Sequence, residues 1–175
     1  KALNETNGNM DEAVEFLRKN GQAKAEKKAS RIAAEGLCMV VTKDDQTAAV
    51  VEVNSETDFV AKNATFQEFV KAVATQAVNS DAADMDAFMA EKWNEDASKT
   101  VSEALVEKVA VIGENLKIRR FEKVVAEHGC VVPYVHGGGR IGVIVDADTD
   151  VVNDTVKEAM HNIAMQIAAL NPKYV

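Results

Sequence analysis

The chain has 175 residues, 47% hydrophobic and 27% charged, a composition typical of a globular protein with one large or two small domains. Its formal net charge of −8 repels phosphate groups over long range, which argues against a general DNA- or RNA-binding protein. No apolar run approaches the roughly 20 residues that span a bilayer, so we expect neither a membrane span nor a secretory leader.

The first 35 residues predict a small helical module. Residues 1–4 resemble the end of a helix, and the pair Asn9 and Glu12 resembles a capping box that starts the next one. We expect Gly21 to end that helix and a second, lysine-rich helix to run from about residue 22 to 34. The apolar face of the first helix carries Met10, Ala13, Val14 and Leu17.

Seven basic and six acidic side chains lie in residues 1–35, while the rest of the chain is strongly acidic. A mildly basic helical entry before an acidic body suits docking to another protein, although a solvated helix face explains these charges more simply. The two cysteines, Cys38 and Cys130, each lie in an apolar run. We interpret them as core residues, which fits a reducing compartment better than a disulfide framework.

A β-hairpin and a helix follow the helical module. Residues 37–42 and 48–53 are β-branched runs separated by the polar turn 43–46. A helix from about 63 to 79 follows, for which Thr65 and Glu68 are candidate caps. Its predicted buried face is Phe66, Phe69, Val70, Val73 and Ala77.

Residues 80–98 are acidic and weakly periodic, and they predict at most short helices around Met85, Phe88 and Met89. Thr100 and Glu103 form a second capping-box pattern, which opens a helix that we expect to end at Gly113. The apolar stripe of this helix is Val101, Ala104, Leu105, Val109 and Ile112.

A second β region and a final helix complete the predicted elements. Residues 116–126 predict a long strand with a bulge near Arg120, and residues 130–136 predict a strand in which Pro133 implies an edge position or an irregularity. Three glycines then turn the chain into a return strand over 140–147. A final helix is expected from about 150 to 170, stopped by Asn171 and Pro172, with the face Val152, Val156, Ala159, Met160, Ile163, Ile167 and Leu170.

Strand pairs and helices segregate in this order and do not alternate singly. The sequence therefore predicts an α+β fold of antiparallel β-hairpins packed with helices.

Tests for catalytic chemistry fail at the level of motifs. The chain has no phosphate-binding loop of the form Gly-x-x-x-x-Gly-Lys-Ser/Thr. The run from His136 to Gly139 matches the oxyanion-hole pattern of some esterases, but no serine lies in a Gly-x-Ser-x-Gly elbow, so a small hydrolase is disfavoured. The spacing of His128, Cys130 and His136 fits no standard zinc pattern.

The segment from Glu52 to Lys62 is the unusual one. A strand runs into polar residues, and Phe59 then follows Asp58 at a strand-to-helix junction. On chemistry alone, the simpler interpretation is that Phe59 folds back as a hydrophobic staple and Asp58 caps the helix. The alternative is that an exposed Phe59 anchors the chain in a pocket of a partner.

This eleven-residue segment, Glu-Val-Asn-Ser-Glu-Thr-Asp-Phe-Val-Ala-Lys, resembles the family motif of elongation factor Ts. Residues 112–120 (Ile-Gly-Glu-Asn-Leu-Lys-Ile-Arg-Arg), 134–143 and 165–172 resemble further stretches of that family. The start of the chain resembles the end of the family's N-terminal module, which is similar to ubiquitin-associated domains. The resemblance implies three parts: the end of this module (1–35), a first core half (36–113) and the start of a related second half (114–175).

The resemblance implies a guanine nucleotide exchange factor that binds elongation factor Tu, both GDP-bound and nucleotide-free, without being an enzyme. Asp58 and Phe59 would enter between two helices of the partner's nucleotide domain near its magnesium site, and His136 would contact that domain beside the phosphate loop. The implied partner-binding residues are Thr57, Asp58, Phe59, Val60, His136 and Gly137. No catalytic residue, metal, cofactor, nucleic acid or membrane is implied.

Two departures from the family pattern concern the chain ends and the glycine turn. The family's N-terminal module begins before Lys1 and its second half continues further, so we expect a segment of a longer protein. The triple glycine differs slightly from the family's shorter Gly-Ala pattern.

A bacterial cytoplasm is the expected location, with an organelle matrix as the alternative. The alternative function is a protein-interaction module without exchange activity.

Overall fold

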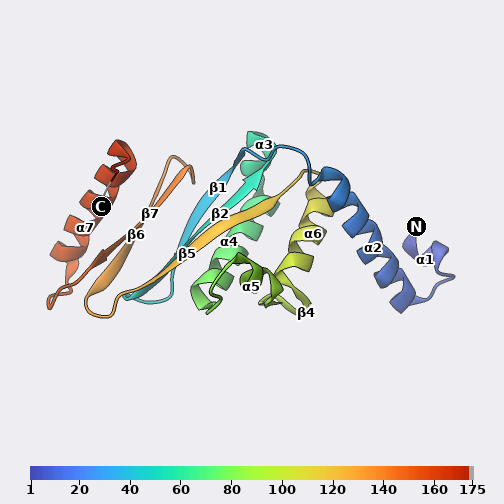
Figure 1. Ribbon diagram of the computed structural model, residues 1–175, viewed down its shortest axis with the longest axis horizontal. Helices are drawn as coiled ribbons and strands as arrows, with labels where there is room; N and C mark the ends of the chain where they lie inside the picture. The colour runs from blue at the N-terminus through green and yellow to red at the C-terminus, as the bar shows by residue number, and fades with distance from the viewer. Residues whose placement is uncertain (174–175) are drawn as a thin grey trace.

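The structure is a computed structural model in which residues 1–173 are described. It is elongated, with the N-terminal helices at one end and a hairpin with its helix at the other (Figure 1). Helices and small antiparallel sheets confirm the predicted α+β class. Within the described residues, none of the helices combines the length and apolarity needed to cross a bilayer.

The N-terminal module consists of α1 (Ala2–Glu5) and α2 (Met10–Lys28). The Asn9 side chain accepts the Glu12 N–H at 3.2 Å, which is one half of the predicted capping box. The other half differs, because the Asn9 backbone N–H donates to the Thr6 carbonyl and the Glu12 carboxylate accepts from Asn9 Nδ2. The predicted helix end at Gly21 is wrong. Gly21 is buried against α6, where an added Cβ would lie 3.8 Å from Val106 Cγ1, and the helix formers after it carry α2 on to Lys28.

The main sheet has the strand order β1–β2–β5 and is antiparallel throughout. Its strands are β1 (Glu35–Thr42), β2 (Thr47–Ser55) and β5 (Lys117–Val125). The β2–β5 register shifts between Ile118 and Arg120, which confirms the predicted bulge. This sheet joins the first hairpin to a strand from the second β region.

Two helices, α4 (Ala64–Asn79) and α6 (Val101–Ile112), contribute most of the helical side of the core. The α6 capping box between Thr100 and Glu103 is present, and the helix ends at Gly113 with φ +87°. The predicted caps of α4 are wrong, because the Asn63 side chain accepts the N–H groups of Thr65 and Phe66. All five residues of its predicted face are buried.

Between these helices lie α5 (Met85–Ala90) and a small hairpin of β3 (Lys92–Trp93) and β4 (Asp96–Thr100). The sequence predicted the short helix but not the hairpin. Trp93 is 4% exposed and packs against Phe69, with ring centroids 5.9 Å apart. Burial of this tryptophan in the main core stabilises a hairpin that has little strand periodicity of its own.

The second hairpin consists of β6 (Cys130–His136) and β7 (Ile141–Ala147), covered by α7 (Asp154–Leu170). It forms a separate two-stranded sheet, so Pro133 lies on a strand with only one paired edge. Met160 and Ala164 of α7 are buried, whereas Ile163 and Leu170 of the predicted face are exposed. Cys130, Val132 and Met160 form a small core of their own.

Candidate partner-binding site

A one-turn helix, α3 (Asp58–Ala61), carries the predicted contact residues at the end of β2 (Figure 1). Thr57 caps it, because its hydroxyl accepts the Val60 N–H at 3.4 Å. Val60 is half-buried against the main core and Ala61 is buried. With these two side chains directed inward, Phe59 is left on the outer side of the turn.

Phe59 is 81% exposed, while the other five phenylalanines of the chain are buried or half-buried. The simpler interpretation of this segment is therefore wrong in both parts. Phe59 does not fold back as a staple, and Thr57, not Asp58, supplies the cap. A large apolar side chain held in water at a helix turn is the arrangement expected of an anchor for a partner pocket.

Asp58 is also accessible, and it forms an ion pair with Lys62 one turn later, with Asp58 Oδ2 2.7 Å from Lys62 Nζ. The hydrogen bond and the charge of Lys62 hold the pKa of Asp58 below its ordinary value. Asp58 is therefore an anion at neutral pH. The turn presents a carboxylate beside an apolar ring.

The turn is fixed from outside by Glu114, which follows the end of α6. The N–H groups of Glu56 and Thr57 each donate to Glu114 Oε2 at 3.1 Å. The Thr57 hydroxyl donates to Glu114 Oε1 at 2.6 Å. In the reverse direction, the N–H of Asn115 donates to Glu56 Oε1 at 2.6 Å.

The tip of the second hairpin carries the other predicted residues, His136 and Gly137, both exposed. The Tyr134 hydroxyl lies 2.8 Å from His136 Nδ1, and this contact orients the ring. Gly137, Gly138 and Gly139 all have positive φ, between +60° and +96°, which favours glycine at each position. The tip therefore presents an imidazole on a backbone almost without side chains.

The same tip rests on β1. The Cys38 N–H donates to the Gly139 carbonyl at 2.6 Å. A Cβ on Gly139 would lie 2.7 Å from Leu37 Cδ2 and 3.2 Å from the Cys38 carbonyl oxygen. Gly139 thus has to be a glycine both for its φ of +96° and for this close approach.

Strand β1 lies between the two candidate contact elements. Glu35 pairs with Ser55, just before the α3 turn, and Cys38 contacts the hairpin tip three residues further on. That separation along a strand is about 10 Å. A depression of about 280 Å³ lies here, with Gly36, Asn54 and Arg140 among its lining residues. Figure 1 shows α3 and the β6–β7 turn along the same upper edge of the molecule.

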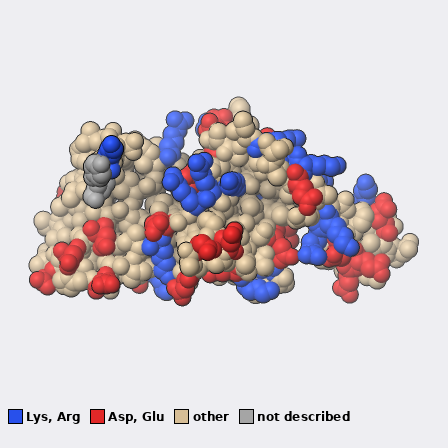
Figure 2. Space-filling view, viewed as in Figure 1, with Lys and Arg blue, Asp and Glu red and all other residues tan. Residues whose placement is uncertain are grey.

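Basic side chains gather over the three-stranded sheet in Figure 2, while acidic ones are frequent along the lower edge. Arg119 and Arg120 of β5 flank Glu52, with Nε–carboxylate distances of 3.6 and 2.7 Å. Both arginines remain mostly exposed. The surface close to the candidate site is therefore locally basic on an acidic protein, which favours an acidic partner surface.

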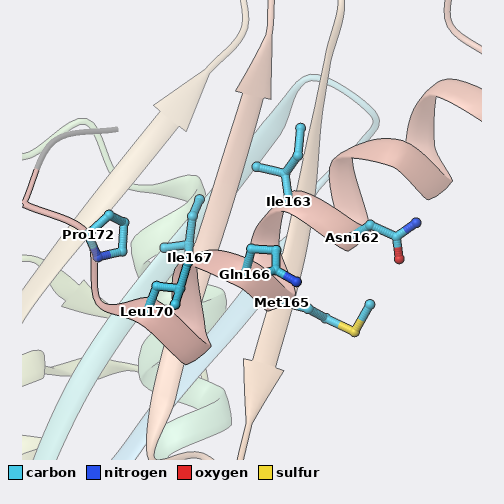
Figure 3. Close-up of a pocket in the computed structure, with 7 residues that line it drawn as sticks. All are labelled: Asn162, Ile163, Met165, Gln166, Ile167, Leu170 and Pro172. Carbon is cyan, nitrogen blue, oxygen red and sulfur yellow. The ribbon is translucent and has the colours of Figure 1, made fainter.

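A larger depression of about 400 Å³ lies on α7 (Figure 3). Figure 3 shows Ile163, Ile167, Leu170 and Pro172 around it, and no predicted contact residue lines it. This depression is an apolar helix face, separate from the candidate site.

The three candidate metal ligands, His128, Cys130 and His136, lie in three different environments. His128 is held between Asp148 and Asp150, Cys130 is buried against Met160, and His136 contacts Tyr134. Among residues 1–173, no group of three His, Cys, Asp or Glu side chains is arranged to hold a metal ion.

Sequence reasoning missed Glu114 and Glu56 as determinants of the site. The signal available was weak: an acidic residue directly after the glycine that ends α6. Nothing in local periodicity links that position to Thr57, which lies 57 residues earlier. Only the pairing of β2 with β5 brings the two together.

Comparison with known proteins identifies the family. Residues 56–175 match the family model described as Elongation factor TS. Curated proteins named Elongation factor Ts match over the whole chain: one from Clostridioides difficile (strain 630) at 51% identity and one from Clostridium novyi (strain NT) at 47%. The chain spans 57% and 58% of the length of these two relatives. The chain therefore belongs to the elongation factor Ts family.

Proposed function

We propose that this chain acts in translation elongation as a guanine nucleotide exchange factor, which binds elongation factor Tu and promotes release of its GDP. The observation that carries the proposal is the exposed Phe59 on an anchored turn, in a chain of this family. No bond in the nucleotide is broken, so the protein is not an enzyme in the chemical sense. We propose a bacterial cytoplasm as its setting, because the relatives are elongation factors named from bacteria.

Phe59 acts as an apolar wedge between two helices of the partner's nucleotide domain, and Asp58 perturbs the polar contacts that hold its magnesium ion. The accessibility of both side chains supports this assignment. Thr57 and Val60 flank these two residues and belong to the same proposed contact segment. Thr57 also caps the turn, and Val60 packs against the main core.

His136 and Gly137 make a second contact beside the partner's phosphate loop. Their position across β1 from α3 supports simultaneous contact of both elements with one domain. The partner is engaged both when GDP is bound and when the nucleotide site is empty, because exchange requires passage through both states.

The free energy gained by burying Phe59 limits its share of the coupling between factor binding and GDP binding. If the factor weakens GDP binding, GDP weakens binding of the factor by the same ratio. Burying one phenylalanine contributes roughly 1.5–3 kcal/mol. At about 1.4 kcal/mol per factor of ten, Phe59 accounts for roughly ten- to a hundredfold. Any larger coupling requires the hairpin tip and the N-terminal helices.

The test is release of a fluorescent GDP analogue from a bacterial elongation factor Tu, with and without this chain and its Phe59→Ala variant. The unmodified chain should accelerate release, and the variant should do so roughly ten- to a hundredfold less well. Val111→Ala, at an α6 side chain that is 73% exposed, is the matched control for lost apolar surface. If the unmodified chain leaves release unchanged, the proposal fails.

A second candidate is a protein-interaction module that binds a partner without exchanging its nucleotide. The apolar face of α2 supports it, because Met10, Val14 and Leu17 are 65%, 59% and 61% exposed. The same assay separates the two, because such a module would bind elongation factor Tu in a pull-down without accelerating release.

A further inference from the structure

One carboxylate links the Phe59 turn to a distant segment of the chain. Glu114 directly follows Gly113, the left-handed residue that ends α6, and its side chain is half-buried. Its two oxygens accept two backbone N–H groups and one hydroxyl from Glu56 and Thr57. The proposed function gives Glu114 no role.

Glu56 makes the reciprocal contact. It accepts the N–H of Asn115 at 2.6 Å and pairs with Arg31, its Oε1 lying 3.5 Å from Arg31 Nη1. Each glutamate therefore accepts a backbone donor from the segment that carries the other. This exchange holds the end of β2 against the end of α6 at more than one point.

The helical module reaches the same junction. Asn115 Nδ2 donates to the Arg31 carbonyl at 2.8 Å, and Lys28 Nζ donates to the Gly113 carbonyl at 2.7 Å. The segment after α2, the end of α6 and the α3 turn thus meet around one pair of glutamates.

The α3 turn needs such support because it has only four residues. A helix of one turn is not stable in water by itself, since nucleation is unfavourable. Hydrogen bonds to a carboxylate are stronger than those between neutral groups, and here they fix the residue that caps the turn. An anchor that is ordered before binding does not pay that ordering cost during binding.

We propose that Glu114 is a positioning residue for nucleotide release: it holds the Thr57–Ala61 turn so that Phe59 projects ready-ordered into the partner, which Glu114 itself does not touch. This inference rests on the proposed role of Phe59. The carboxylate acts on exchange only through the orientation of that ring.

The first experiment compares Glu114→Ala and Glu114→Gln in the GDP-release assay. Glu114→Ala should slow accelerated release about tenfold, the factor expected when about one backbone residue regains its freedom. Glu114→Gln keeps the side-chain volume and can still accept the two N–H groups. It should therefore reduce the acceleration of GDP release only about threefold. Loss in this order, alanine more than glutamine, is the expected result.

The second experiment combines Glu114→Ala with Phe59→Ala in one chain. If Glu114 acts through Phe59, Glu114→Ala should slow release little further in the Phe59→Ala background. A merely structural role would instead lower exchange equally in both backgrounds. Glu107→Ala is the matched control, because Glu107 is an α6 carboxylate that pairs with Lys99.

A partner-free measurement completes the test. Hydrogen exchange at the Glu56 and Thr57 amides should become faster in Glu114→Ala and stay unchanged in Glu107→Ala.

Failure of the proposed function and failure of this inference are distinguishable. Full activity of Phe59→Ala overturns the proposed function and this inference with it. Full activity of Glu114→Ala with an impaired Phe59→Ala overturns the inference alone.

Discussion

The α3 turn and the β6–β7 tip lie on either side of β1, but they are held in opposite ways. The turn depends on side chains: Glu114, Glu56 and Thr57 supply the bonds that fix it. The tip depends on the lack of a side chain, because Gly139 lets backbone approach backbone at Cys38. One element is therefore sensitive to loss of a carboxylate and the other to gain of a methyl group.

The two elements also present different chemistry. The turn exposes a large apolar ring whose burial can supply binding energy, whereas the tip exposes an imidazole and glycine backbone. A rigid apolar anchor beside a polar contact is a common division in protein interfaces. We infer that, in the proposed complex, the turn supplies most of the binding free energy and the tip mainly fixes the orientation of the partner.

The largest expected effect is on stability, from Gly139→Ala. A Cβ there meets Leu37 and Cys38 at a φ that disfavours other residues, so we expect a loss of about 2–4 kcal/mol in urea unfolding. Gly138→Ala, at φ +67° with nothing within 4 Å, should cost only about 1–2 kcal/mol. Equal losses of stability in both variants would show that the close approach of Gly139 to β1 does not contribute to stability.

Phe59→Ala should have the opposite profile, with little effect on stability and a large effect on exchange. Because the ring is exposed, its loss should change the free energy of unfolding by no more than about 0.5 kcal/mol. Nucleotide release should nevertheless slow roughly ten- to a hundredfold. The pair of measurements is circular dichroism during unfolding and the fluorescent-GDP assay. A loss of helical signal would support packing of the ring within its own chain.

His136→Ala should have a smaller effect on exchange, about threefold, if the tip serves mainly for orientation. The control is His128→Ala, an exposed histidine near the other end of the same hairpin, held by Asp148 and Asp150. An effect of His136→Ala as large as that of Phe59→Ala would contradict the proposed division.

The smallest effect is chemical and reports on the tip. Burial raises the pKa of the Cys38 thiol, so less thiolate is present at pH 8 and alkylation by iodoacetamide should be slower than for free cysteine. The rate should keep rising at pH values where free cysteine has levelled off. Gly139→Ala, which lifts the tip from β1, should accelerate the reaction; an unchanged rate would mean that the tip does not cover Cys38.

Most of the regular elements could be predicted from local pattern. The β1–β2 hairpin, the buried face of α4, the Thr100 and Glu103 capping box and the bulge near Arg120 each depend on residues close in sequence. The β3–β4 hairpin could not be predicted, because its stability comes from Trp93 reaching a core built by other segments. For the candidate site, the segment could be located but not its anchoring.

The sequence by itself determined the fold class, the family motif around Phe59 and the glycines that the second turn requires, because propensity, periodicity and positive φ are local properties. Only the tertiary structure decided that α2 continues through Gly21, that Phe59 points outward and that Glu114 holds Thr57. Each of these depends on which distant segment supplies the neighbour. A side chain turns outward or inward according to the packing around it, and that packing is built from residues far away in the chain.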